Sequence, residues 1–393
     1  MPIRPGDARA LTETLVRIDS RNPTLVPGAP GESGVAHVLA EVLGGWGFRL
    51  EWQDVRDGRS NLLARVGTPA PGAPVLMFNG HLDVVGVDGM DHPPFAPTID
   101  GDRLYGRGSC DMKAGVAAMC VAAWQAAQRG IRGEIIVAAV IDEEFESLGT
   151  RAMLERGTRA DVAVVTEPTR LAICPAHRGF VWLEFAFTGR AAHGSRYDIG
   201  IDAIQHAAVL LTALDRYQHS TLITRTHPLL GRASLHASTI AGGVGWSTYP
   251  DACTLRVERR TVPGESTASV LREVEMLLRE LRASDPTLSV TVRVDTAQGP
   301  SDVAVDAPLV QRLSAAHLAA RGTVPPVEGL SAWTDAALLN DAGIPAVCFG
   351  PGDIALAHAA TEYVPLSEID AATAVLTAFA LDWCSQGIAV ALG

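Results

Sequence analysis

Imidazole and carboxylate side chains follow the ends of several apolar runs in this 393-residue chain. Five of them stand at such positions: His81, Asp83, Glu143, Glu144 and Glu167. Asp111 opens the helix-like run that follows the first of these runs, and His358 lies in a loop after the Gly-rich turn FGPGD. Two imidazoles and several carboxylates are ligands that suit Zn²⁺ or chemically similar ions. Two metals about 3.5–4 Å apart need a bridging carboxylate and terminal ligands on each side. The set contains enough acids for such a pair, with one to spare.

Two of these acids, Glu143 and Glu144, are adjacent at the end of the apolar run GEIIVAAVIDEE. On an extended backbone, neighbouring side chains point to opposite faces. We therefore expect one of them to bind metal while the other faces the reacting water. A single acid at a strand end usually caps a helix or is solvated, and a single histidine is usually structural. What indicates a site is that five such stretches occur in one chain, those that contain His81, Asp111, Glu143, Glu167 and His358.

Composition and charge argue against several classes of protein. Lys and Arg number 32 against 44 Asp and Glu, a net charge of −12, which argues against nucleic acid or an anionic membrane as partner. No apolar run approaches the roughly 18 residues of a membrane span, and residues 1–20 show no apolar signal segment. The six cysteines are scattered, with no CxxC pair, which favours a reducing compartment. We expect a cytoplasmic protein.

The seven side chains need elements to position them, and the chain up to about residue 175 alternates predicted strands with predicted helices. The strands are 48–55, 60–67, 75–80, 133–144 and 160–169, and the helices are 6–18, 34–43, 116–130 and 150–157. This pattern predicts an α/β domain with a mixed, mostly parallel sheet flanked by helices, and ligands gather outside the carboxyl ends of such strands. No GxGxxG follows a strand, so a dinucleotide-binding fold is the weaker alternative.

From about Ala176 the pattern changes to strand, helix, strand, strand, helix, strand, ending near residue 297. This order is the split-βαβ, or ferredoxin-like, motif. The α/β pattern then resumes. We therefore predict a catalytic domain of residues 1–177 and 296–393, with an inserted domain of residues 178–295.

The motifs GHLDVV, GRGSCDMKAG, DEE, TEPT and AHAATEYV, with AHGS in the inserted segment, occur in one order along the chain. In this order the chain resembles the M20 metallopeptidase and amidohydrolase family. That family includes acetylornithine deacetylase, succinyl-diaminopimelate desuccinylase, aminoacylase and glutamate carboxypeptidase. The resemblance covers essentially the whole chain.

The resemblance implies a site for two divalent metal ions, Zn²⁺ first and Co²⁺ as the alternative. His81 and Glu167 would bind one ion, and Glu144 and His358 the other. Asp111 would bridge the two.

The resemblance also implies catalytic roles. Asp83 would accept the second ring N–H of His81 and fix its tautomer. Glu143 would act as general base toward a water between the metals and later protonate the departing amine. His193, in AHGS, would stabilise the oxyanion in the active site of a neighbouring subunit. This last role requires a homodimer through the inserted domain, which would also close over the site as a lid.

Substrate contacts follow from the same resemblance. Arg260 would pair with the substrate's α-carboxylate, and Arg178 is a weaker candidate for a second anion contact. Gly350 and Gly352 would shape the loop that presents His358 and approach the substrate with their backbone.

Three positions depart from the family pattern and put the choice of substrate in doubt. Ser247 stands where the family usually has Asn, Tyr197 where it usually has Pro, and Trp333 where it usually has a small polar residue. We count Ser247 among the candidate substrate contacts.

The leading hypothesis is hydrolysis of N-acyl amino acids, since the family's carboxypeptidase-like members more often carry Asp in place of Glu167. The alternative is a dipeptidase or a glutamate-carboxypeptidase-like enzyme. A non-catalytic binding member of the family is a third possibility from another class. Such proteins usually lack a ligand or the base, and none is missing here.

Overall fold

The computed structural model describes residues 3–68 and 70–385, which form two compact units. Unit 2 consists of Ala176–Asp302 and Gly329–Trp333, and unit 1 is the remainder of the described chain. The inserted segment is thus longer than the predicted 178–295, and a second short segment joins it. That unit 2 acts as a lid or carries a dimer contact stays a prediction.

The main sheet has nine strands, eight of them in the order β1-β2-β6-β3-β7-β17-β8-β15, with β16 also paired to β8. The strands are β1 (Arg49–Arg56), β2 (Arg59–Gly67), β3 (Val75–His81), β6 (Glu134–Val140), β7 (Val162–Val165), β8 (Ile173–His177), β15 (Ser301–Asp302), β16 (Val327–Leu330) and β17 (Ala346–Cys348). The four central strands, β6, β3, β7 and β17, run parallel to one another. The strands outside them pair antiparallel along this order. The predicted mixed α/β fold is confirmed, with its parallel part at the centre.

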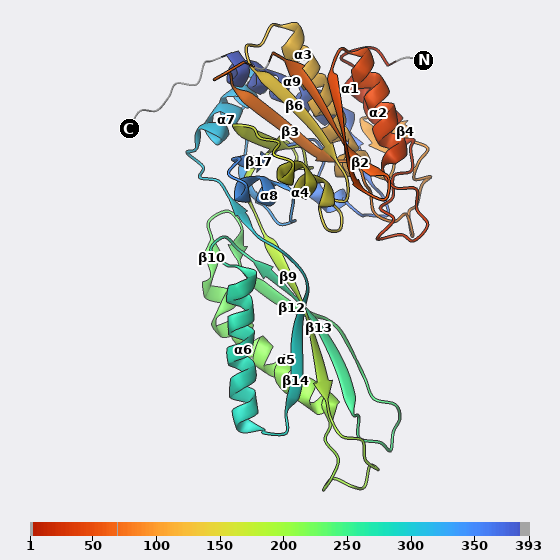
Figure 1. Ribbon diagram of the computed structural model, residues 1–393, viewed down its shortest axis with the longest axis vertical. Helices are drawn as coiled ribbons and strands as arrows, with labels where there is room; N and C mark the ends of the chain where they lie inside the picture. Colours follow the sequence, from red (N-terminus) through yellow and green to blue (C-terminus); the bar gives the residue numbers. More distant parts are fainter. Residues whose placement is uncertain (1–2, 69, 386–393) are drawn as a thin grey trace. The chain divides into compact units, whose positions relative to one another are not determined.

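Helices cover both faces of this sheet. They are α1 (Ala8–Val16), α2 (Ser33–Gly45), α3 (Ala114–Gln128), α4 (Leu148–Glu155), α7 (Pro308–Arg321), α8 (Ala336–Asp341) and α9 (Leu366–Ser385). Buried residues of α1, α2, α3, α7 and α9 share one apolar core, while α4 and α8 pack against each other on the other face. Figure 1 shows α3 and α9 on one side of the strands and α4 and α8 on the other.

Strand sequences explain why both faces are covered. In β3, Leu76 and Phe78 belong to the core under α3 and α9, whereas Met77 is equally buried but lies outside that core. Because side chains alternate between the faces of a strand, an apolar residue at each position requires helices on both sides. The continuous apolar runs of the sequence reflect this arrangement.

A close contact fixes α3 against the end of β7. A Cβ added to Gly115, in the first turn of α3, would lie 2.0 Å from the carbonyl oxygen of Thr166. Only glycine permits this approach. It brings the segment Ser109–Lys113, which contains Asp111, next to the end of the strand that leads to Glu167.

Three short strands form a separate small sheet in the order β18-β5-β4 in unit 1. They are β4 (Thr98–Asp100), β5 (Arg103–Tyr105) and β18 (Tyr363–Pro365). Single turns of 3₁₀-helix occur at Leu222–Thr224 and Ile354–Leu356.

Unit 2 has a four-stranded antiparallel sheet in the order β12-β13-β9-β14. Its elements are β9 (Gly179–Thr188), α5 (Ala203–Ser220), β12 (Ser234–Gly242), β13 (Ala252–Thr261), α6 (Thr267–Ser284) and β14 (Ser289–Gln298), with a small hairpin of β10 (Thr226–His227) and β11 (Gly231–Arg232). Apolar side chains of β9 and β13 form one core with α5 and α6. The βαββαβ order agrees with the sequence pattern.

In the part of the chain that the structure describes, we find no helix with both the length and the apolar content that crossing a membrane requires.

Candidate metal centre

The acids and imidazoles of unit 1 meet at the carboxyl ends of the parallel strands. β3 ends at His81, β7 ends two residues before Glu167, and β6 leads into the turn that contains Glu143 and Glu144. Asp111 lies just before α3. The carboxyl edge of the parallel strands is where open α/β sheets place their sites.

Distances place two imidazoles on opposite sides of Asp111. The Nε2 atom of His81 lies 3.1 Å from Oδ1 of Asp111, and Nε2 of His358 lies 3.6 Å from Oδ2 of Asp111. His358 is also 3.0 Å from Oε2 of Glu144. His81 is 3.8 Å from Oε1 of Glu167. One oxygen of Asp111 therefore faces each histidine, an arrangement that suits a bridging carboxylate.

Two groups of potential ligands share His81. Ligand atoms of His81, Asp111 and Glu144 all lie within 4.8 Å of one another, as do those of His81, Glu143 and Glu167. Among the described residues, Oε1 of Glu144 and Oε1 of Glu167 are buried oxygens without a hydrogen-bond partner. A buried carboxylate oxygen without a donor favours a cation beside it. The residues present therefore fit divalent metal ions.

The pKa shifts of these side chains also favour cations at this site. Burial raises the pKa of Glu143 and Glu167 well above the usual range, with a further rise from the charge of a neighbouring acid. Burial lowers the pKa of His81, but its hydrogen bond to Asp111 and the surrounding carboxylates outweigh this and hold the pKa well above normal. The hydrogen bond to Glu144 raises the pKa of His358 to about 9. Burial and mutual repulsion thus disfavour the charged form of these acids, and cations placed among them would relieve this.

The expectation that Glu143 and Glu144 extend in opposite directions from a strand is wrong. β6 ends at Val140, and both residues lie in a turn that follows Asp142, whose φ of 67° is left-handed. The turn lets both side chains reach the site: Glu143 lies 3.8 Å from His81, and Glu144 contacts His358.

Asp83 supports the site differently from the predicted way. The Nδ1 atom of His81 lies 2.9 Å from the backbone carbonyl oxygen of Asp83 and 3.5 Å from its carboxylate, so the carbonyl is the nearer acceptor. The carboxylate oxygens accept the backbone N–H groups of Glu143 and Glu144, each at 3.2 Å. Asp83 thus positions the turn as well as the ring.

Sequence reasoning missed a buried polar network beneath this turn. Asn22 donates to the carboxylates of both Asp83 and Asp142, each at 2.9 Å. Arg59 donates to both oxygens of Glu32, at 2.8 and 2.6 Å, and to Asp142 at 3.0 Å. All five side chains are buried. Nothing local in the sequence signals their burial, since the bonded pairs are 27 to 120 residues apart.

Glu362 was missed as well. It is fully buried and its carboxylate accepts the N–H of Asp111 at 3.1 Å. It lies within the stretch AHAATEYV, which also contains His358. Its position inside that motif was the signal that could have identified it.

In unit 2, His193 and Ser247 lie on two loops that pair with each other. His193 forms an isolated β-bridge with Thr248, and the N–H of Gly194 donates to the carbonyl of Ser247 at 2.8 Å. The His193 ring contacts Oγ of Ser195 at 2.8 Å. His193 and Ser247 are both exposed.

Arg260 and Arg178 lie near one another on unit 2. Arg260 pairs with Glu258 at 3.0 Å and its guanidinium lies 5.5 Å from the centre of the Phe180 ring. Burial lowers the pKa of Arg178, and the charges of Arg260 and Arg232 lower it further. The Nε atom of Arg178 is buried without a hydrogen-bond partner in the described structure. These guanidiniums make a basic region that suits an anion.

Gly350 and Gly352 are packing positions. The N–H of Gly350 donates to Oγ1 of Thr169 at 3.1 Å, and that of Gly352 donates to Glu368 at 2.8 Å. Both glycines are buried. Because their N–H groups already have partners, the structure gives no support to the expected backbone contact with substrate. A Cβ on Gly350 would lie 2.6 Å from the carbonyl oxygen of Glu167, so this glycine lets the two loops approach closely.

Of the three departures, Trp333 donates its indole N–H to the carbonyl of Gly299 at 2.9 Å and packs edge-on against His177. Tyr197 is 84% exposed. Trp333 thus has a structural contact of its own, whereas Tyr197 is free to meet a ligand.

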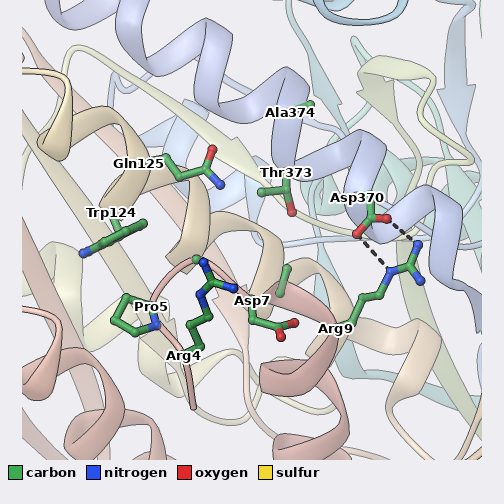
Figure 2. A pocket seen from close by; sticks show the side chains of 11 residues that line it. Arg4, Pro5, Asp7, Arg9, Trp124, Gln125, Asp370, Thr373 and Ala374 are labelled. Atoms are coloured by element: carbon green, nitrogen blue, oxygen red, sulfur yellow. Dashed lines mark hydrogen bonds and ion pairs between the residues drawn. The ribbon is translucent and has the colours of Figure 1, made fainter.

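A separate cavity of about 560 Å³ lies on unit 1, lined by the segment before α1 and by α3 and α9 (Figure 2). Its two carboxylates are already used: Asp7 caps α1 by accepting the N–H of Ala10, and Asp370 pairs with Arg9. No histidine is among its lining residues. The donors that suit a metal lie at the strand ends instead.

Comparison with known proteins identifies a family of hydrolases. The model of peptidase family M20/M25/M40 matches residues 77–382. An acetylornithine deacetylase of Myxococcus xanthus is 31% identical over 348 residues, covering 86% of this chain and 89% of the relative. An N-acetyl-L-citrulline deacetylase of Xanthomonas campestris pv. campestris is 32% identical, covering 91% of this chain and 93% of the relative.

Solved structures share the fold at low identity. The aminopeptidase PepT of Bacillus cereus superposes with a TM-score of 0.79 at 19% identity, covering 97% of this chain and 99% of that chain. A dinuclear metal binding peptidase of Bacillus subtilis gives a TM-score of 0.72 at 16% identity, covering 96% and 97%. With the family model matching most of its length, the chain belongs to peptidase family M20/M25/M40 and is a hydrolase of that family.

Proposed function

We propose that this protein is a di-metal amidohydrolase that cleaves the amide bond of N-acyl amino acids. The observation that carries the proposal is the pair of ligand groups that share His81, with Asp111 facing both histidines. The relatives that are 31% and 32% identical bear the names of deacetylases of N-acetylated amino acids. The solved peptidases, at lower identity, support the fold alone.

We assign His81 and Glu167 to one metal and Glu144 and His358 to the other, with Asp111 between them. The distances support Asp111 between the two histidines and Glu144 beside His358. Glu143 and Glu167 lie equally far from His81, at 3.8 Å, and the choice of Glu167 as its partner follows the family resemblance. Nitrogen and carboxylate donors favour Zn²⁺, and Co²⁺ suits the same set. When bound, two such ions polarise the amide carbonyl and make a water molecule acidic enough to ionise near neutral pH.

Glu143 is the acid left over from this assignment, and we propose it as the general base. Its carboxylate lies near His81 and is largely buried, and its backbone N–H is held by Asp83. In this role it takes a proton from the attacking water and gives it to the nitrogen of the departing amine. Burial raises its pKa above the usual carboxylate range, a direction that favours holding the proton until the amine departs.

His193 is proposed to donate a hydrogen bond to the oxyanion of the tetrahedral intermediate, in the active site of a second copy of the chain. Its exposure leaves the ring open to such a contact. The proposed assembly is a homodimer through unit 2.

The cysteines bear on the location of the protein. All six are buried and unpaired, which supports a reducing cytoplasm.

The basic region of unit 2 supports an amino acid as the released product. Arg178, with its unpartnered Nε, and Arg260 are the groups we assign to the substrate's α-carboxylate. A guanidinium binds a carboxylate through two parallel hydrogen bonds.

A substrate panel tests the proposal. The purified protein, supplied with Zn²⁺ or Co²⁺, should hydrolyse N-acetyl, N-succinyl or N-formyl amino acids with a higher kcat/KM than dipeptides. The N-formyl compounds are included because a 28% identical relative from Bacillus subtilis bears the name of a deformylase. Faster hydrolysis of dipeptides would identify a dipeptidase or carboxypeptidase instead, and no hydrolysis of either class would favour a binding protein.

The role of Glu143 has its own test. Glu143→Ala should lower kcat about 10²–10⁴-fold while two metals per chain are retained. Glu146→Ala is the matched control, since Glu146 lies in the same turn and faces Arg56 rather than the site. A Glu143→Ala variant that keeps full activity would refute the assignment, as would one that loses metal.

A further inference from the structure

Glu362 is a buried acid that the proposed chemistry leaves unused. It lies in unit 1 just before β18, and its side chain is completely shielded from solvent. Arg107 pairs with it at 2.7 Å and is itself 3% exposed. A buried ion pair that joins positions 255 residues apart fixes two distant segments to each other.

The carboxylate of Glu362 is fully occupied by donors from the segment that presents Asp111. Oε1 accepts the N–H groups of Cys110 at 2.9 Å and Asp111 at 3.1 Å. Oε2 accepts Nη1 of Arg107 at 2.7 Å and the N–H of Gly108 at 3.1 Å. A carboxylate has about four acceptor positions, and here four donors fill them. The loop from Arg107 to Asp111 is therefore wrapped around one side chain.

The backbone of Glu362 belongs to the segment that presents His358. The carbonyl of Glu362 accepts the N–H of Gly106 at 3.3 Å and lies 3.1 Å from Nε2 of His92. Only three residues separate Glu362 from His358, whose φ of 61° is left-handed. Glu362 thus contacts the loop from Arg107 to Asp111 through its side chain, and it contacts Gly106, just before that loop, through its carbonyl.

Arg107 extends the connection to the segment after Asp83. Its Nε donates to the carbonyl of Gly86 at 3.0 Å, and its backbone N–H donates to the carbonyl of Pro94 at 2.8 Å. Three segments of unit 1 therefore meet at the ion pair of Arg107 and Glu362: the one that follows Asp83, the one that leads to Asp111 and the one that follows His358.

We propose that Glu362 is a positioning residue that sets the separation between Asp111 and His358, and thereby the affinity for the metal between them. This inference rests on the metal assignment proposed above. Glu362 does not touch either ligand's reacting atoms. It acts through the N–H of Asp111 and through the three residues that lead back to His358.

The carboxylate form is required by the donor count. Glutamine at this position offers one acceptor oxygen and presents an NH₂ group to backbone N–H donors. At least two of the four donors would lose their acceptor, and the Arg107 charge would be left buried without a partner. The loop that contains Asp111 would then relax away from its present position.

The test is a Co²⁺ titration of the metal-free full-length chain, followed by the absorption spectrum of bound Co²⁺. Wild type should bind two Co²⁺ per chain, and this count tests the metal assignment by itself. Glu362→Gln should weaken Co²⁺ binding about 10–100-fold at the site of His358, and by a smaller factor at the second site, which Asp111 also contacts. Two sites of wild-type affinity in this variant would overturn the inference while leaving the proposed function intact.

A control separates positioning from a general loss of stability. Glu134, also in unit 1, is a nearly buried acid that pairs with Arg49 and Arg65 at 2.7 and 3.1 Å. Glu134→Gln should lower stability without changing either Co²⁺ affinity. Equal weakening of Co²⁺ binding in both variants would show a merely structural role for Glu362 and reject the proposal.

A second variant keeps the test valid if Glu362→Gln fails to fold. Arg107→Lys leaves the carboxylate and a positive charge in place but lacks the guanidinium that also reaches Gly86. It should weaken the same Co²⁺ site by a smaller factor than Glu362→Gln and shift the Co²⁺ spectrum in the same direction. Glu362→Asp, which keeps the charge, should recover part of the lost affinity. Unchanged Co²⁺ binding in Arg107→Lys would count against the proposal.

Discussion

Two histidines with proposed catalytic roles, one in each unit, have opposite surroundings. His81 is 1% exposed and its ring is fixed by the carbonyl of Asp83 and the carboxylate of Asp111. His193 lies on an exposed loop, where its ring contacts the hydroxyl and N–H of nearby Ser195. The ligands of unit 1 are held by buried partners, whereas His193 is held by residues of its own exposed loop and by the backbone of the neighbouring one.

The difference separates two requirements of the proposed chemistry. Metal ligands must be held at short, fixed distances before substrate arrives, and a buried network supplies that rigidity. A group that contacts the oxyanion needs access to substrate more than a rigid surrounding. The comparison predicts that damage to unit 1 affects metal binding and folding, and that damage to the unit 2 loops affects turnover alone.

The largest effect is expected at Asp111. Asp111→Ala removes the carboxylate that faces both histidines. We expect activity to fall further than the about 10²–10⁴-fold predicted for loss of Glu143, and metal content to drop below two ions per chain. Elemental analysis after dialysis measures the metal content. Asp100→Ala, at an exposed position of β4, is the control. If Asp111→Ala retained two metals per chain, the proposal that Asp111 binds both metals would be wrong.

The buried network beneath the turn is the next target. Arg59→Met leaves Glu32 and Asp142 buried without their cation and should destabilise the metal-free protein by about 3–5 kcal/mol. Arg56→Met removes only an exposed partner of Glu146 and should cost about 1 kcal/mol or less. Urea denaturation of both variants gives the comparison. Similar losses in the two would show that the network adds little rigidity.

His193 tests the other side of the comparison. His193→Ala should lower kcat about 10²–10³-fold, the usual effect of losing one oxyanion donor. Metal content and unfolding free energy should stay at wild-type values because the ring is exposed. His219→Ala, on the surface of α5, should leave kcat unchanged. A loss of bound metal in His193→Ala would place this histidine among the ligands and end the distinction between the units.

The smallest predicted effect concerns acid stability and His177, a buried histidine of unit 2. Burial lowers the pKa of His177 to about 4, against 6.5 for an ordinary histidine. The unfolded chain therefore takes up a proton between about pH 6.5 and pH 4 while the folded ring stays neutral. Stability falls through this window as pH falls, by about 3 kcal/mol at pH 4.

His177→Phe removes this contribution. Unfolding free energies measured at pH 7 and pH 4 should differ by about 3 kcal/mol less in the variant than in wild type. His236→Phe, at an exposed position of β12, should keep the wild-type pH dependence. An identical pH dependence in wild type and His177→Phe would show that the histidine is not held neutral.

The main elements of both units could be predicted from the sequence because their signals are local. Apolar runs such as VLMFNG form buried strands, and the helical spacing before and after them forms the covering helices. The acids and histidines after the strands were identified for the same reason, since strand ends share one edge of the sheet. The structure brings all seven of them together around His81 and His358.

Arg59 could not be identified in this way, and for Glu362 the one sequence signal was its place in the motif AHAATEYV. Each is a charged residue that would be solvated on most surfaces, and its burial results from contacts with segments far away in the chain. The turn at Asp142 was also missed, because a left-handed residue after an apolar strand leaves no periodic signal. Local patterns predict which residue types reach the site and do not reveal which buried partners hold them.

The insertion of unit 2 within unit 1 also determines the order in which the nascent chain can fold. All four strands of the unit 2 sheet lie between Gly179 and Gln298, so that sheet is complete before the last third of unit 1 has been synthesised. At that stage β7 lacks its neighbour β17 and presents an unpaired apolar edge. Exposed strand edges promote aggregation. The growing polypeptide therefore carries this unpaired edge until Ala346–Cys348 has been added.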